Sequence, residues 1–149
     1  MGMDVSPGVS ELLPNETWDT LEATPSAVLI DVRTEAEWSF VGCPDLSSLG
    51  NRMHCIEWAQ YPDMSVNPRF VAQVKDALGG ATPPTIFFLC RSGARSLRAA
   101  QAVSEALNET EHVCDCVNVT EGFEGDLDAQ KHRGGLNGWK ARGLPWRQS

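Results

Sequence analysis

The chain contains a short, continuously apolar run, Thr85-Ile86-Phe87-Phe88-Leu89, that leads directly into a cysteine. An apolar run of this length, without polar residues in alternation, is typical of a strand that is covered on both faces. Pro83 and Pro84 separate the run from the preceding helical pattern, and apolar residues at helical spacing begin again near Leu97. The stretch therefore predicts a buried strand that ends at Cys90 and is followed by a tight turn and a helix.

The predicted turn has the composition of an anion cradle. It reads Cys90-Arg91-Ser92-Gly93-Ala94-Arg95-Ser96. The N-terminus of a helix and nearby arginines favour the thiolate form of a cysteine. Several backbone N–H groups of such a turn can also point at one anion. We therefore expect Cys90 to be a nucleophile and residues 91–96 to bind an anionic substrate.

The rest of the chain alternates predicted strands with predicted helices. Further strands are expected at residues 9–13, 27–30, 53–58 and 112–120, and helices are expected to start near Pro14, Thr34 and Asn67. This alternation predicts an α/β fold with a mainly parallel sheet and helices on both faces. Because sites in such folds lie beyond the carboxyl ends of the strands, Asp31, Arg33, Cys90 and the segment after Thr120 are expected at one edge.

Length and composition narrow the function classes. A chain of 149 residues fits one domain, here residues 1–149. The net charge of −8 argues against nucleic acid as a partner. A membrane partner is not expected, because no apolar run approaches the roughly 20 residues of a membrane span. The N-terminus does not resemble a signal peptide, and a cytoplasmic protein is predicted.

The five cysteines are an odd number and suit free thiols in a reducing compartment. Cys114 and Cys116 share one face of a predicted strand, where core packing is expected. Neither a metal site nor a cofactor is predicted, because no paired ligand spacing supports a metal. Cys43 is interpreted either as an unpaired loop thiol or as a partner for disulfide exchange with Cys90.

Three motifs, in this order, resemble those of single-domain rhodaneses, a family of sulfurtransferases. They are Leu29-Ile30-Asp31-Val32-Arg33 with Glu37, the loop from Cys90 to Ser96, and Gly134-Gly135-Leu136-Asn137-Gly138-Trp139 with Gly143-Leu144-Pro145. The resemblance implies a three-layer α/β/α domain with a five-stranded parallel sheet. It also implies that Cys90 takes sulfur from a small anionic donor such as thiosulfate and passes it, as a persulfide, to cyanide or to a small or protein thiol.

The resemblance assigns supporting roles as well. Asp31 is expected to lie near the loop and to orient Arg91 or Arg95, with Arg33 beside it. Two segments depart from the family pattern: Gly42-Cys43-Pro44-Asp45-Leu46, and the acidic stretch from Glu121 to Asp128. The acidic stretch is expected at the active edge, either as a segment that shapes entry to Cys90 or as a solvated surface loop.

Two other functions compete with sulfur transfer. Phosphatase-like loops place five residues between the cysteine and the arginine, whereas four separate Cys90 from Arg95 and Ser96 takes the arginine position. The smaller cradle suits a sulfur atom better than a phosphate ester or arsenate, so a phosphatase or arsenate reductase is the second hypothesis. The third is a non-catalytic binding or sulfur-carrier module, although the presence of Cys90 and both arginines favours catalysis. The oligomeric state is not predicted.

Overall fold

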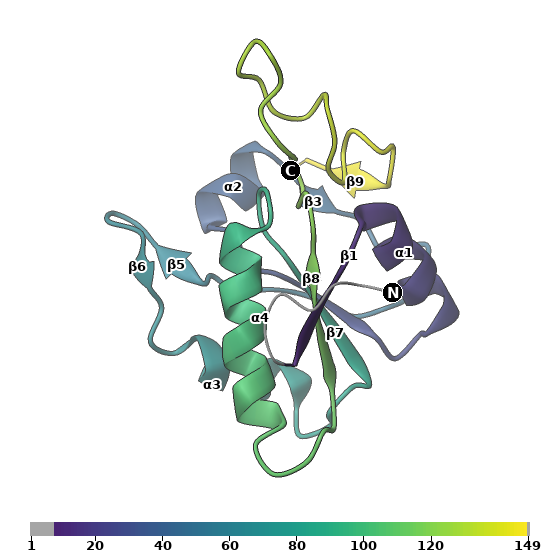
Figure 1. The fold of residues 1–149 in the computed structure, drawn as a ribbon, viewed down its shortest axis with the longest axis vertical. Helices are drawn as coiled ribbons and strands as arrows, with labels where there is room; N and C mark the ends of the chain where they lie inside the picture. Colours follow the sequence, from purple (N-terminus) through teal and green to yellow (C-terminus); the bar gives the residue numbers. More distant parts are fainter. Residues whose placement is uncertain (1–7, 149) are drawn as a thin grey trace.

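The computed structural model describes residues 8–148 and is built around a five-stranded parallel sheet. The strands lie in the order β1 (Val9–Leu12), β8 (Asp115–Val119), β7 (Thr85–Leu89), β2 (Val28–Asp31) and β4 (Met53–Cys55). Figure 1 labels the first three of them. All four pairings between neighbouring strands are parallel. The α/β fold with a parallel sheet is therefore confirmed. β7 is buried, as predicted, and it lies at the centre of the sheet.

Helices cover both faces of the sheet. On one face, α3 (Phe70–Leu78) and α4 (Ala94–Leu107) pack against a core that includes Val74, Phe88 and Val103. On the other face, α1 (Pro14–Ala23) and the C-terminal segment contribute Leu21, Phe123 and Trp139 to a second core. The result is a three-layer α/β/α architecture, as the family resemblance implied.

The helix boundaries follow local signals in the sequence. In α2 (Glu35–Phe40), the Thr34 hydroxyl accepts a bond from the Glu37 N–H, and the Glu37 carboxylate accepts one from the Thr34 N–H, which completes the predicted capping box. Gly79 ends α3 with a φ of 68°, a conformation that favours glycine. Among the described residues, no helix has the length and apolar character that a membrane span requires.

Two short antiparallel ribbons lie outside the elements that the sequence predicts. One pairs β5 (Ala59–Gln60) with β6 (Ser65–Val66), and the other pairs β3 (Cys43–Pro44) with β9 (Trp146–Arg147). The strand expected at residues 53–58 ends at Cys55, before the first ribbon. Strands of two residues are too short to show alternation, so their sequences read as connections. The second ribbon fastens the end of the chain beside the carboxyl edge of the sheet.

Candidate active site

The residues predicted for the site gather at the carboxyl edge of the sheet. Asp31 ends β2 and is the register partner of Leu89, which ends β7 immediately before Cys90. Cys55, at the end of β4, is the register partner of Asp31 on the other side. The parallel register thus brings Asp31, Arg33 and Cys90 to one edge although they lie far apart in sequence.

The turn after β7 folds around the sulfur of Cys90. The Cys90 side chain is buried, with a residue exposure of 1 %. Its Sγ accepts a hydrogen bond from the Gly93 N–H at 3.1 Å, and the hydroxyl of Ser96 lies at the same distance. Gly93 precedes α4 with a φ of 112°, which an L side chain rarely adopts. The sulfur therefore lies at the N-terminus of α4, where the helix dipole and N–H groups favour negative charge.

Ser96 connects Cys90 to two residues that sequence reasoning missed. Its Oγ lies 2.5 Å from Oδ1 of Asn118, and Nδ2 of Asn118 donates to Glu11 at 2.8 Å and to the Gly93 carbonyl at 3.1 Å. Glu11 in β1 and Asn118 in β8 are register partners. A polar asparagine within the apolar strand sequence Cys116-Val117-Asn118-Val119 was the one available signal, because such a residue needs hydrogen-bond partners when it is buried.

The two arginines of the loop differ in their surroundings. The Arg91 side chain is exposed and donates no hydrogen bond to another residue between 8 and 148. Arg95 binds both oxygens of Glu37, at 2.8 and 2.9 Å. The expectation that Asp31 orients Arg91 or Arg95 is therefore wrong. Glu37, in the first turn of α2, has that role for Arg95.

Asp31 instead holds Arg33 in a buried ion pair. Both side chains are fully buried, and Nη2 of Arg33 lies 2.6 Å from the Asp31 carboxylate. Burial opposes charge on Arg33, but the hydrogen bond and charge of Asp31 outweigh burial and raise the pKa of Arg33. The guanidinium also donates to the Gly42 carbonyl at 2.7 Å and lies 4.3 Å from the centre of the Phe123 ring. Arg33 thus ties two loops to the end of β2.

The stretch from Glu121 to Asp128 divides into two parts. Its first part is packed under the active-site loop: the Phe123 N–H donates to the Cys90 carbonyl at 2.8 Å, and the Glu124 N–H donates to the Arg91 carbonyl at 3.0 Å. At Gly122, any Cβ would lie 2.5 Å from the backbone of Cys90 and Arg91, so only glycine allows this approach. The second part, residues 126–128, is largely exposed. The hypothesis of a solvated surface loop therefore fits only the second part.

The other cysteines fall into two groups. Cys114 and Cys116 are buried in the core, in agreement with the predicted packing role. Cys43 lies beside Cys55, and their sulfurs and a carboxylate oxygen of Asp31 lie within 4.8 Å of one another, a set that could hold a metal ion. Burial, together with the charge of Asp31 and the neighbouring Cys43, raises the pKa of Cys55 to about 12. Cys55 is therefore a neutral thiol at physiological pH.

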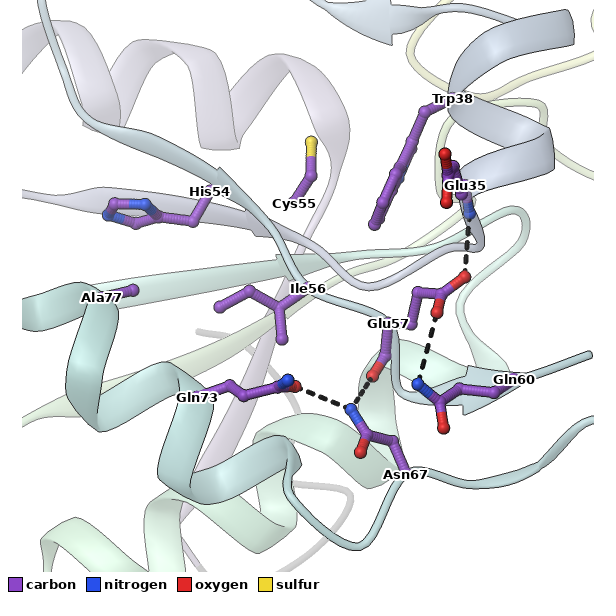
Figure 2. A pocket seen from close by; sticks show the side chains of 10 residues that line it. All are labelled: Glu35, Trp38, His54, Cys55, Ile56, Glu57, Gln60, Asn67, Gln73 and Ala77. Atoms are coloured by element: carbon purple, nitrogen blue, oxygen red, sulfur yellow. Dashed lines mark hydrogen bonds between the residues drawn. The ribbon is translucent and has the colours of Figure 1, made fainter.

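A cavity of about 430 Å³ lies at the edge strand β4 and does not include Cys90 among its lining residues. Figure 2 shows that Trp38, His54 and Cys55 line one part of it and that Glu57 and Asn67 lie on the opposite side. Glu57 accepts hydrogen bonds from the Glu35 N–H and from Gln60, which fixes this polar wall. The cavity is thus separate from the cradle around Cys90.

The Glu37–Arg95 pair makes a testable contribution to stability. Burial opposes ionisation of Glu37, but the hydrogen bonds and charge of Arg95 outweigh it and lower the pKa of Glu37 to about 2. Because this pKa is below that of an unfolded chain, about 4.3, the pair stabilises the fold above about pH 4.3 and loses this effect as the pH falls toward about 2. Glu37→Gln should lower the free energy of unfolding at pH 7 by about 1–3 kcal/mol.

Urea unfolding at pH 7 and pH 3 checks this expectation. The difference in stability between the protein and Glu37→Gln should be smaller at pH 3 than at pH 7. Glu35→Gln removes the same charge from an exposed position of the same helix and is the matched control. Equal losses in the two variants at pH 7 would contradict the role given to Arg95.

Relatives of this chain are found among proteins of known sequence, although no family model matches it. The RP600 homolog of Rickettsia rickettsii, an uncharacterized protein, is 33% identical over 138 residues, which span 93% of this chain and 97% of the relative. The crystal structure of Rv0390 from M. tuberculosis is 47% identical, with a TM-score of 0.82, and the match covers 93% of this chain and 97% of that one.

More distant structures identify the fold. The polysulfide-sulfur transferase homodimer of Wolinella succinogenes has a TM-score of 0.60 at 18% identity, covering 95% of this chain and 80% of that one. A rhodanese-like domain protein of Staphylococcus aureus has a TM-score of 0.51 at 15% identity, covering 93% and 97%. The chain therefore belongs to the protein family of rickettsial RP600 and Rv0390, a family with the rhodanese-like fold.

Proposed function

We propose that this chain is a sulfurtransferase that carries sulfane sulfur on Cys90. The observation that carries the proposal is the surroundings of the cysteine: Sγ is buried at the N-terminus of α4, 3.1 Å from both the Gly93 N–H nitrogen and the Ser96 hydroxyl. The fold likeness to the polysulfide-sulfur transferase of W. succinogenes supports the same chemistry. A persulfide is an anion, and this cradle suits an anion of that size.

The first half-reaction loads the cysteine. The Cys90 thiolate attacks the outer sulfur of thiosulfate, a bond forms between Sγ and that sulfur, and the sulfur–sulfur bond of thiosulfate breaks. Sulfite leaves with the electron pair of the broken bond, and Cys90 becomes a persulfide anion. The Gly93 N–H and the dipole of α4 stabilise the charge that remains on sulfur.

The second half-reaction regenerates the Cys90 thiolate from the persulfide. A thiolate or cyanide attacks the outer sulfur of the persulfide, and the bond between the two sulfurs breaks with its electron pair on Sγ. The products are a new persulfide or thiocyanate and the Cys90 thiolate. Arg91 is exposed, and its positive charge would attract either anionic reactant.

A comparison of three substrates tests the proposed function. Thiosulfate, 3-mercaptopyruvate and an aryl phosphate are assayed side by side, the sulfur donors with cyanide as acceptor. We expect turnover of thiosulfate and none of the aryl phosphate. Turnover of the aryl phosphate alone would overturn the proposal in favour of a phosphatase. Failure of Cys90 to take up sulfur from any donor would favour a binding module.

Loss of the Arg91 charge should weaken donor binding. Because Arg91 is exposed and has no ion-pair partner among residues 8–148, Arg91→Ala should raise the KM for thiosulfate about three- to tenfold with little change in kcat. Arg98→Ala removes the same charge from an exposed position one turn along α4 and is the matched control. Steady-state kinetics at low ionic strength measure both variants.

The Arg91 prediction fails if Arg91→Ala and Arg98→Ala have the same KM. Arg95→Ala should also raise the KM for thiosulfate, but it removes the partner of the partly buried Glu37 as well. Its kinetics are therefore compared only after its free energy of unfolding is known. Unchanged kinetics in both Arg91→Ala and Arg95→Ala would remove the donor-binding role from the arginines.

A further inference from the structure

The hydrogen bonds around Asn118 leave its amide one orientation. Nδ2 carries two hydrogens, and its two neighbours are the Glu11 carboxylate at 2.8 Å and the Gly93 carbonyl at 3.1 Å, both of which only accept. Oδ1 must therefore face Ser96, at 2.5 Å. Asn118 is 1 % exposed, so water does not replace these partners. Since Oδ1 can only accept, it requires the hydrogen of the Ser96 hydroxyl.

The hydroxyl of Ser96 has one hydrogen and two neighbours. Ser96 Oγ lies closer to Asn118 Oδ1 than to Cys90 Sγ, so the hydroxyl donates its hydrogen to Asn118. The lone pairs of Ser96 Oγ then face Cys90 Sγ at 3.1 Å, where a neutral thiol can donate its own hydrogen. A thiolate at this position would face the lone pairs of Ser96 Oγ, which repel it. Ser96 could instead turn its hydrogen toward the sulfur, but the buried Oδ1 of Asn118 would then have no donor.

We infer that Glu11 and Asn118 are positioning residues that hold the Ser96 hydrogen away from Cys90 and so favour its neutral thiol in the resting protein. Asn118 Oδ1 and Cys90 Sγ compete for the hydrogen of the Ser96 hydroxyl. Glu11 fixes the amide of Asn118 in the orientation in which Oδ1 accepts that hydrogen. The Gly93 N–H and the N-terminus of α4 act in the opposite direction, because they favour the thiolate. The importance of this balance for sulfur transfer rests on the function proposed above.

Other charges near the loop are unchanged by the variants used to test this inference. Three ion pairs lie near the loop: Glu37 with Arg95, Asp31 with Arg33 and Glu121 with Arg142. Glu11, Arg91, Arg98 and Glu124 form no ion pair among residues 8–148. Arg95 and Cys90 are close enough for their charges to interact. Substituting Asn118 by an apolar residue alters none of the three ion pairs, and of these charged groups only Glu11 loses a hydrogen bond.

The test measures the thiol itself rather than turnover. The rate at which iodoacetamide alkylates Cys90 is followed from pH 5 to 10 by mass spectrometry of the peptide that contains it. Asn118→Leu frees the Ser96 hydrogen for the thiolate, so the midpoint of the alkylation rate against pH should move to lower pH. Well below this midpoint, alkylation should be about tenfold faster than in the unsubstituted protein. Glu11→Gln, which weakens the hold on the amide, should move the midpoint in the same direction by less.

A double variant separates this mechanism from a general disturbance of the site. With Ser96→Ala as background, Asn118→Leu should have no further effect, because the contested hydrogen is gone. Thr120→Val removes the side-chain hydrogen bond that the residue after β8 donates to the Leu12 carbonyl in β1, and it should leave the midpoint unchanged. The inference is overturned if Asn118→Leu shifts the midpoint equally with and without Ser96, or if Thr120→Val shifts it as much.

Three further outcomes are decisive. If Asn118→Leu does not fold, Glu11→Gln alone decides, and an unchanged midpoint overturns the inference. If the midpoint shifts as expected but Cys90 takes up no sulfur, the proposed function fails and the inference stands. If sulfur uptake occurs and no variant shifts the midpoint, the inference alone fails.

Discussion

Cys90→Ser should abolish the gain of one sulfur atom that we expect thiosulfate treatment to produce in this protein. The expected loss is complete, because a serine hydroxyl at neutral pH is far too weak a nucleophile to attack the donor and cannot form a persulfide. The substitution is nearly isosteric, and the new hydroxyl would retain the Gly93 N–H as a partner, so the fold should persist. Intact-mass spectrometry after thiosulfate treatment, with and without a reductant, measures the sulfur that is carried.

The other cysteines supply the controls for this result. Cys43→Ser and Cys55→Ser change the two thiols that lie together near Asp31, and both variants should still gain one sulfur atom. A sulfur gain that survives Cys90→Ser, or one that is lost in Cys55→Ser, would show that the carrier is elsewhere. The cavity lined by Cys55 would then be the place to look.

Asp31→Asn will destabilise the fold strongly. Asp31 is the partner of Arg33, and both side chains have no exposed surface. Removing the negative charge leaves a buried guanidinium without compensation, and breaking such a pair costs about 3–5 kcal/mol. Urea unfolding measures the free energy of unfolding. If this free energy falls with urea concentration at the same slope in both proteins, both expose the same surface on unfolding.

The buried position of the pair is what makes the expected effect large. Asp115→Asn breaks the exposed pair between Asp115 and His112, whose side chains are 63% and 60% exposed, and should cost less than about 1 kcal/mol. The double variant Asp31→Leu with Arg33→Met should be more stable than Asp31→Asn, because it removes both charges together. A loss below about 1 kcal/mol for Asp31→Asn would contradict this account of the pair.

The local parts of the site could be predicted from the sequence. The strand Thr85–Leu89, the turn at Gly93 and the capping box of Thr34 with Glu37 all depend on residues within a few positions of each other. The sheet edge could also be predicted, because parallel strands place their carboxyl ends together. These signals were sufficient to bring Cys90, Asp31 and Arg33 to one edge.

The partners of the side chains could not be predicted in the same way. Glu37 fits its capping role from local sequence alone, but its bond to Arg95 joins residues 58 positions apart. The capping motif contains no information about that second contact. The family resemblance assigns Asp31 to a loop arginine, whereas Arg33, two residues away, takes both of its oxygens. The carboxylate is thus already paired with an arginine that is close to it in sequence.

Asn118 and Glu11 show a different limit. Their contact depends on β8 lying between β1 and β7. The hydrophobic periodicity of a single strand does not predict the order of the strands in the sheet. Sequence reasoning misses the buried part of the segment after Thr120 for a similar reason. Its acidic residues left open either a segment that shapes entry to Cys90 or a solvated loop, and neither hypothesis included the packing of Gly122 and Phe123 against the backbone of Cys90 and Arg91.

The place of β8 in the sheet also affects how the protein is made. A ribosome synthesises β1, β2, β4, β7 and α4 before β8, although β8 lies between β1 and β7 in the finished sheet. Asn118 reaches Ser96 only when this late strand enters the gap, and the segment that supports the Cys90 backbone follows it. Until then, Ser96 and Gly93 lack their hydrogen bonds to Asn118, so the polar network beside Cys90 is completed only after residue 118 has been translated.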